Sequence, residues 1–183
     1  MRGERQTDSG GEAGGPPVRD HDGRVRVARL SARGLALIVA ACVVALDQLT
    51  KLWVLRGIAD NPIVLIDGFL QLRITRNTGA AFSLFVNSGP LLAVVASIVV
   101  VAIYMSLGDT DRRLEAVALG LILGGAVGNL IDRMFRGDGF LDGAVIDFID
   151  FSFFPSFNVA DSAITIGVAL LLLAGILRSR RGE

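Results

Sequence analysis

Two aspartates are the residues of this chain whose setting points most directly to chemistry. Asp147 stands in the phrase Val-Ile-Asp-Phe, and Asp161 closes the phrase Phe-Asn-Val-Ala-Asp at the mouth of a long apolar run. An ionised carboxylate is expensive at such a place, so a charge there usually has a task. Two carboxylates within reach of one water molecule can divide general-acid and general-base work between them.

Other common catalytic groups are nearly absent. The chain has one histidine, His21, in a polar stretch, and one cysteine, Cys42, inside an apolar stretch. Imidazole and thiol chemistry at the same site is therefore almost excluded, and a disulfide within the chain is impossible. We expect no metal site and no cofactor, because histidine and cysteine ligands are lacking.

The composition is that of a membrane protein, since 52% of the 183 residues are hydrophobic. Four apolar segments, at about 35–55, 90–107, 114–131 and 159–177, each approach the ~20 residues that a helix needs to cross a ~30 Å hydrocarbon core. We therefore expect an α-helical polytopic membrane protein with four transmembrane helices in residues 31–183. Residues 1–30 are rich in Gly, Arg, Asp and Glu without apolar periodicity, which predicts a disordered tail.

The arginines near the spans predict the orientation in the membrane. Four spans place both termini on one side, and nine arginines lie on that side against five on the other. Arginine resists translocation, so the termini are expected to be cytoplasmic. The formal net charge is zero, and no basic patch indicates a nucleic-acid partner.

The connecting segments predict structure outside the membrane. Leu70–Thr75 alternates apolar and polar residues, which favours a half-buried strand and a small extracytoplasmic sheet. Residues 134–157 contain several glycines, aromatics and acids, a composition typical of a structured loop on the membrane surface.

With this topology the polar side chains of the spans gather at one end, the outer one. They are Asp47, Lys51, Asn77, Asn129, Asp132, Arg133, Asn158 and Asp161, with Asp147 in the loop just before the fourth span. Chance scattering would have placed some of them at the inner ends. The layer predicts a polar site at the outer membrane surface.

Several of these residues also have a purely structural interpretation. Asp47 and Lys51 are four residues apart in the order that favours a helix ion pair. Asn129, Asp132 and Arg133 could cap the third helix, and Asn77 could be a turn residue. Gly120, Gly124 and Gly128 form a stripe of small residues that lets another helix approach closely.

Rival functions use the same residues differently. A small transporter or proton channel also places carboxylates in the membrane, but it needs polar groups along a path through it, and none occurs at mid-span. A serine–lysine peptidase would use Ser83 and Lys51.

Val39–Cys42 resembles the box at which bacterial lipoproteins are lipidated, yet a helix-packing cysteine is the better interpretation. Asp150, near Asp147, competes with it on local sequence alone.

Five ordered phrases together resemble the lipoprotein signal peptidases, the type II signal peptidases of bacteria. The phrases span residues 47–51, 77–82, 128–133, 145–148 and 157–161, and the resemblance covers about residues 35–177. It implies a membrane aspartic endopeptidase of the bacterial inner membrane, with its active site on the extracytoplasmic side. Its substrates would be prolipoproteins, cut before a cysteine that carries a diacylglyceryl group whose chains stay among the membrane lipids.

The resemblance also implies roles for individual residues. Asp147 and Asp161 would be the catalytic pair, which leaves Asp150 in a supporting role. Asn77, Asn129, Arg133 and Asn158 would hold the substrate, and the shape of the pocket would be supported by Asp47, Lys51, Gly79 and Asp132. The strand near Leu70 would belong to an extracytoplasmic cradle.

Overall fold

The computed structural model describes residues 30–58, 61–79, 89–139 and 141–180. Within these ranges four helices are long and apolar enough to cross a membrane: α1 (Ala32–Gly57), α2 (Gly89–Ser106), α3 (Arg113–Phe135) and α4 (Val159–Arg180). A 3-10 turn, η2 (Leu107–Asp109), follows α2. The predicted fold class is confirmed. The predicted tail, apart from Leu30, and Ser83 lie outside the described residues.

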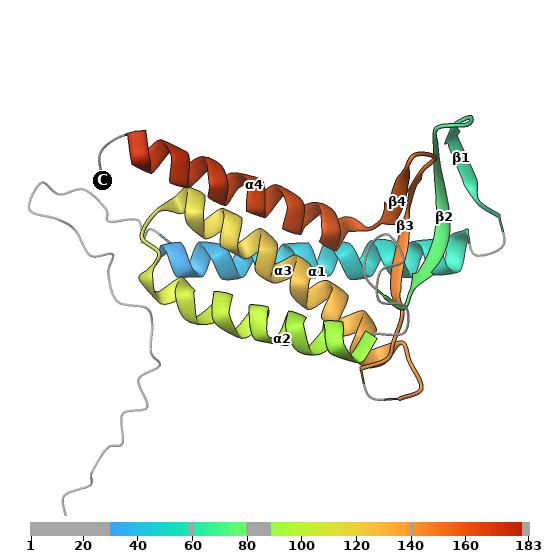
Figure 1. Ribbon diagram of the computed structural model, residues 1–183, viewed down its shortest axis with the longest axis horizontal. Coiled ribbons are helices and arrows are strands. Elements are labelled where there is room, and N and C mark those ends of the chain that lie inside the picture. Colours follow the sequence, from blue (N-terminus) through green and yellow to red (C-terminus); the bar gives the residue numbers. More distant parts are fainter. Residues whose placement is uncertain (1–29, 59–60, 80–88, 140, 181–183) are drawn as a thin grey trace, which may run out of the picture. The chain divides into compact units, whose positions relative to one another are not determined.

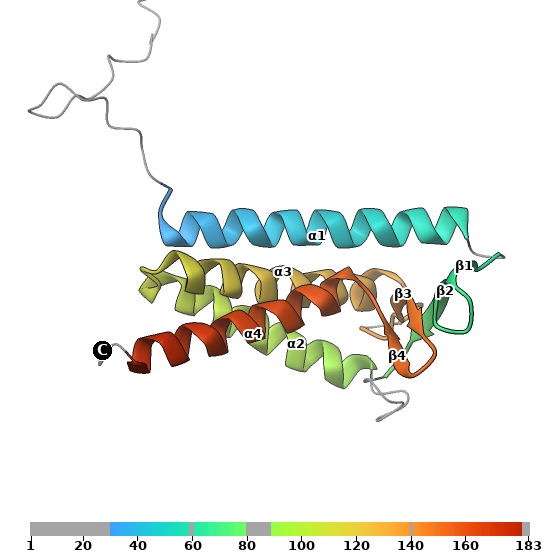
Figure 2. The ribbon, with the colours of Figure 1, turned by 90° about the horizontal axis from the view of Figure 1, so that it is seen from above.

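Helix α3 is the centre of the helical bundle, because it packs against α1, α2 and α4 (Figures 1 and 2). The predicted stripe of small residues makes its contact with α1 possible. A Cβ on Gly120 would lie 2.5 Å from the carbonyl oxygen of Ala36, and one on Gly124 would lie 2.7 Å from that of Ala40. Only glycine lets the two backbones approach this closely.

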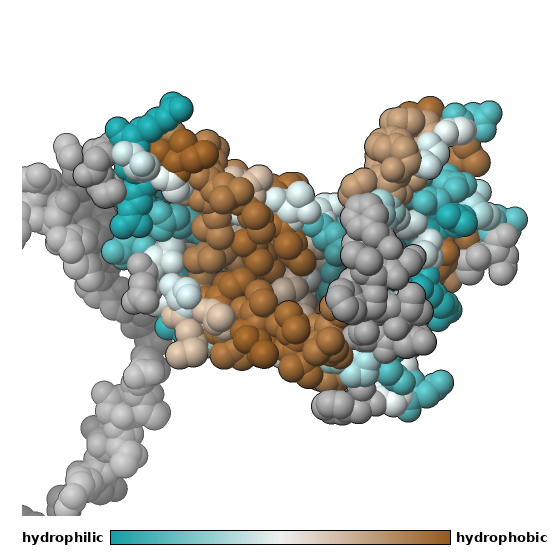
Figure 3. Space-filling model, viewed as in Figure 1, coloured by the Kyte–Doolittle hydropathy of each residue, from teal (hydrophilic) through white to brown (hydrophobic). Residues whose placement is uncertain are grey.

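The outward faces of the helices are apolar. Figure 3 shows a broad hydrophobic band over the helices, with hydrophilic residues at both of its ends. Such a band is what a lipid-facing surface requires, since side chains in hydrocarbon lose nothing by being exposed to it. Cys42 belongs to the exposed part of α1. The interpretation of Cys42 as a helix-packing residue is therefore wrong.

A four-stranded antiparallel sheet lies at one end of the bundle (Figure 1). Its strands follow the order β1 (Ile63–Ile66), β2 (Leu70–Asn77), β3 (Val145–Phe151) and β4 (Phe154–Phe157). The predicted strand is β2, and the predicted surface loop contains both β3 and β4. In the register of β2 and β3, Thr75 is opposite Asp147 and Gln71 is opposite Asp150.

Strand β3 packs on the C-terminal end of α1 and thereby directs Asp147. Ile146 and Phe148 are buried in one cluster with Val54 and Ile58. Successive side chains of a strand point to opposite faces, so Asp147, between these two residues, faces away from α1. The apolar neighbours thus turn the carboxyl group toward the space between the sheet, α3 and α4.

Helix α3 continues beyond its predicted end. It runs to Phe135, with Arg136 as its C-cap. Asn129, Asp132 and Arg133 therefore lie within the helix and do not cap it. The helix accommodates these polar residues because each of them forms a hydrogen bond or an ion pair with a residue outside α3.

Candidate active site

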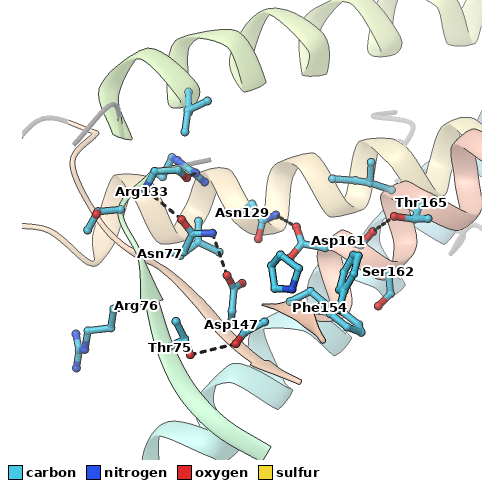
Figure 4. Close-up of a pocket in the computed structure, with 18 of the residues that line it drawn as sticks. Thr75, Arg76, Asn77, Asn129, Arg133, Asp147, Phe154, Asp161, Ser162 and Thr165 are labelled. Atoms are coloured by element: carbon cyan, nitrogen blue, oxygen red, sulfur yellow. Dashed lines mark hydrogen bonds between the residues drawn. The ribbon is translucent and has the colours of Figure 1, made fainter. Parts of the chain in front are cut away.

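A cavity of about 1030 Å³ lies where the sheet meets α3 and α4. Strands β2, β3 and β4 form one side of it, α3 and α4 form another, and Leu92 of α2 adds an apolar wall. Both predicted catalytic residues, Asp147 from β3 and Asp161 from α4, line this cavity (Figure 4). Residues 14 positions apart in the chain thus present two carboxyl groups to one space.

Asp147 is almost fully buried, and both of its oxygens accept hydrogen bonds. Asn77 Nδ2 donates to Oδ2 at 3.0 Å, and Asn158 Nδ2 donates to Oδ1 at 2.7 Å. Burial raises the pKa of Asp147 to about 7, and the negative charge of Asp161 adds to the rise. The two amide donors and the charge of Lys51 oppose it. Asp147 is therefore a carboxyl group that exchanges its proton near neutral pH.

Asp161 is held by the start of its own helix. Asn158 Oδ1 accepts from the Asp161 backbone N–H at 2.9 Å, and Asp161 Oδ2 accepts from the Asn158 backbone N–H at 3.1 Å. This reciprocal pair is a capping box, with Asn158 as the N-cap. Asp161 Oδ1 accepts a further bond from Asn129 Nδ2 at 2.8 Å. The first turn of a helix also favours a negative charge.

Asn158 links the two carboxyl groups. Its Nδ2 donates to Asp147, and its Oδ1 and backbone N–H belong to the capping box of Asp161. The same Nδ2 lies 3.1 Å from Asn129 Oδ1. Because Asn158 is fully buried, it has little freedom to leave this position. A single side chain thus fixes the relative placement of the pair.

Arg133 brings positive charge to the cavity wall. It is largely buried, and its Nη2 donates to the carbonyl oxygen of Gly79 at 3.3 Å. Within the described part of the chain its Nε has no hydrogen-bond partner. Arg133 lines the cavity, and a guanidinium in such a place is suited to bind a carbonyl or carboxylate oxygen.

Asn77 combines the structural and the functional interpretation. Its Oδ1 accepts from the Gly79 backbone N–H at 3.1 Å, which is the turn that the sequence predicted, while its Nδ2 donates to Asp147. The turn therefore orients the amide that contacts the carboxyl group.

Asp150 is not part of the cavity. Its carboxylate accepts from Gln71 Nε2 at 2.7 Å, Arg73 Nε at 3.0 Å and Ser156 Oγ at 2.9 Å. Burial raises its pKa, but these three hydrogen bonds and the charge of Arg73 together hold the pKa below its ordinary value. Asp150 joins β2, β3 and β4, and no described contact brings it to the other two aspartates.

A buried ion cluster lies behind the site, between α1 and α3. Lys51 Nζ is 2.8 Å from Asp47 Oδ2 and 2.7 Å from Asp132 Oδ2, and all three side chains are fully buried. The predicted ion pair between Asp47 and Lys51 is thus confirmed. Asp47 Oδ1 accepts from the Ala160 backbone N–H at 3.0 Å, and Asp132 Oδ2 accepts from that of Ile146 at 3.2 Å. The cluster therefore ties α4 and β3 to the bundle.

Some members of the site and of the cluster were missed by sequence reasoning. Gln48 donates to Asp47 Oδ2, and Arg136 Nε is 2.6 Å from Asp132 Oδ1. Thr75 and Ser156 line the cavity and share a hydrogen bond of 3.3 Å. The spacing of Asp132 and Arg136, four residues apart on one helix, was a usable signal for that pair. Thr75 and Ser156 meet only through strand pairing. No group of three or more metal-ligating side chains occurs among the described residues.

Comparison with known proteins agrees with this arrangement. Residues 39–177 match the family model described as signal peptidase (SPase) II. The chain belongs to the signal peptidase II family. Proteins named lipoprotein signal peptidase are similar over most of its length. That of Shouchella clausii is 46% identical, with 80% of this chain and 95% of the relative covered, and that of Rhodococcus jostii is 42% identical, with 79% and 74% covered.

A solved structure supports the assignment of the fold to the family. A bacterial membrane enzyme superposes with a TM-score of 0.74 at 28% identity, covering 86% of this chain and 97% of that one. Together with the four apolar helices, these similarities identify a bacterial multi-pass membrane protein of a peptidase family.

Proposed function

We propose that this protein is an aspartic endopeptidase that removes signal peptides from prolipoproteins, with Asp147 and Asp161 as its catalytic pair. The observation that carries the proposal is that these two carboxyl groups line one cavity while burial and mutual repulsion raise the pKa of Asp147 to about 7. The names of the similar proteins supply the class of substrate.

The chemistry follows from a pair that shares one proton. Two carboxylates so placed do not both ionise cheaply, and the raised pKa of Asp147 favours that residue as the proton carrier below about pH 7. Asp161, the partner carboxylate, accepts a proton from water, whose oxygen attacks the scissile carbonyl carbon while Asp147 donates its proton to the developing oxyanion. The tetrahedral intermediate then collapses: Asp161 gives its proton to the leaving nitrogen as the C–N bond breaks, and one hydroxyl of the intermediate returns its proton to Asp147.

Arg133 and the amides complete the site. The guanidinium of Arg133, which lines the cavity, is suited to a backbone carbonyl of the substrate and would hold the extended peptide across the pair. Asn77 and Asn129 each donate to one carboxyl group and thereby keep both side chains directed into the cavity. Such positioning removes most of the orientational cost of the reaction.

The apolar part of the cavity suits a lipid-modified substrate. Leu92 of α2 and Ile164 and Ile166 of α4 line the same space as the two aspartates. A signal-peptide helix and the acyl chains of a diacylglyceryl cysteine would remain in contact with these side chains and with membrane lipid. The bond before that cysteine would then lie at the level of the carboxyl groups, which accounts for cleavage at this position.

The orientation proposed from the arginines places this site outside the cytoplasm. The sheet lies at the end of the bundle opposite to the start of α1 and the end of α4 (Figure 2). The cavity is beside the sheet, because β2, β3 and β4 line it. With these two helix ends on the cytoplasmic side, the cavity opens at the outer membrane surface, where exported prolipoproteins are found.

Cleavage of a lipidated prolipoprotein by purified protein in membranes tests the proposal. We expect Asp147→Asn and Asp161→Asn to fold and to be inactive, whereas Asp150→Asn is the matched control and keeps appreciable activity because it contacts neither carboxyl group. Loss of cleavage in Asp150→Asn alone, or activity in either of the other two variants, would refute the assignment.

A further inference from the structure

The buried Lys51 makes one contact that charge neutralisation does not require. Its ammonium bonds Asp47, Asp132 and, at 3.1 Å, Asn129 Oδ1. An ammonium group has three N–H donors and no acceptor, so these three contacts use its full capacity. One carboxylate alone would neutralise the ammonium, and each of the two has further partners of its own. The contact with Asn129 is therefore the one that calls for a different explanation.

That contact determines which way the Asn129 amide points. Its Oδ1 accepts from Lys51 Nζ and from Asn158 Nδ2, both at 3.1 Å. Its Nδ2 is consequently turned toward Asp161 Oδ1, at 2.8 Å. Rotating the amide by half a turn would bring its NH₂ against an ammonium and its oxygen against a carboxylate, so both bonds would be lost.

We propose that Lys51 is a positioning residue for the reaction: by holding the Asn129 amide in one orientation, it keeps an N–H donor on Asp161. This inference rests on the proposed function and deepens it. Lys51 is fully buried and does not line the cavity, so it acts through Asn129 and not on the substrate. The other charged groups that act on this part of the site are Asp147 from β3 and Asp132 and Arg133 from α3.

Removal of Lys51 has a consequence that a purely structural role would not produce. Without the ammonium the Asn129 oxygen keeps only one of its two donors, Asn158 Nδ2, so the amide N–H is held less firmly on Asp161 Oδ1. The Asp161 carboxyl group is then less precisely placed for the reaction. The turnover number falls, whereas KM stays the same because no substrate contact changes.

The double variant Lys51→Met/Asp47→Asn tests this, because it removes one positive and one negative charge together. In the cleavage assay we expect kcat to fall by about tenfold or more while KM changes little. Arg136→Gln is the control: it disturbs the same cluster at Asp132 but leaves the bond between Lys51 and Asn129 in place, and its kcat should match that of the wild type.

A folded double variant with wild-type kcat, or one in which only KM rises, overturns the proposal, as does an equal loss of kcat in Arg136→Gln. If the double variant does not fold, Lys51→Arg carries the test, since it keeps the charge but places its donors differently. A lowered kcat at unchanged KM then supports the positioning role, and an unchanged kcat refutes it. Wild type and Asp161→Asn are assayed alongside. Their failure to differ in cleavage refutes the proposed function, whereas an unchanged Lys51 variant beside a normal pair refutes only the positioning role.

Discussion

Asp147→Asn should make the protein more stable above neutral pH although it abolishes activity. The pKa of Asp147 is about 7 in the folded protein against 3.8 for an unperturbed aspartate. Between these two values the unfolded chain has released the proton of Asp147 while the folded protein still holds it. The free energy of unfolding of the wild type therefore falls as the pH rises from about 4 to about 7. The asparagine variant has no such dependence at this position.

The size of the effect follows from the two pKa values. Their difference of about 3 units, at ~1.4 kcal/mol each, corresponds to ~4 kcal/mol at pH 8, of which about 2 kcal/mol is already present at pH 5. The free energy of unfolding of the variant should therefore exceed that of the wild type by about 2 kcal/mol more at pH 8 than at pH 5. This corresponds to roughly 5 °C in thermal midpoint for a domain of this size.

Thermal unfolding of both proteins in one detergent at a series of pH values measures this difference. Titrating groups that do not interact with Asp147 affect both proteins equally, so only the difference between the two proteins is interpreted. Asp150→Asn serves as a control of opposite sign, because the pKa of Asp150 is lowered: that variant should be less stable than the wild type at pH 8, and the deficit should shrink as the pH falls below about 4. If the difference in thermal midpoint between Asp147→Asn and the wild type stays constant from pH 5 to pH 8, the conclusion that Asp147 is desolvated and carries a proton is refuted.

Three further results are expected. Asn77→Ala removes a donor to the ionised form of Asp147, so the alkaline limb of the pH–rate profile should move up by about one unit; a downward shift would contradict the geometry. Gly128→Ala places a Cβ 2.7 Å from Asp47 Oδ2 and should lower stability by ~1–3 kcal/mol in a thermal unfolding assay, whereas Gly175→Ala, with nothing within 4 Å of its Cβ, should be tolerated. Treatment with a chelator should leave cleavage intact, and a loss that added zinc restores would require a metal in the mechanism.

The helices and the positions of the chemically important residues could be predicted from sequence because each depends on local pattern. The spans follow from long apolar runs, and Asp147 and Asp161 stand out because their charge is costly where it lies. The ion pair of Asp47 and Lys51 follows from a spacing of four residues. These features need no knowledge of which distant segments meet.

Features that depend on tertiary contacts could not be predicted in this way. Strand β3 is mostly buried, with Ile146, Asp147 and Phe148 all inaccessible, so it lacks the alternation that identified β2. The end of α3 was placed too early because Asp132 and Arg133 resemble a polar boundary, and their partners on α1 and just after β2 lie far away in the chain. The orientation of an asparagine amide, on which the site depends, is set wholly by such distant partners.

The reciprocal hydrogen bonds between Asn158 and Asp161 give the Asp161 carboxyl group a second role beside the proposed catalysis. The same carboxyl group caps the first turn of α4. The active geometry is thus inherited from ordinary helix initiation and exists before any substrate arrives. A replacement such as alanine, which removes the side-chain acceptor at either position, disturbs folding and turnover at once, whereas asparagine at position 161 keeps an oxygen that can accept from the Asn158 N–H. A protein in which these two residues begin a helix beside a buried strand therefore already has one carboxyl group of such a pair in position.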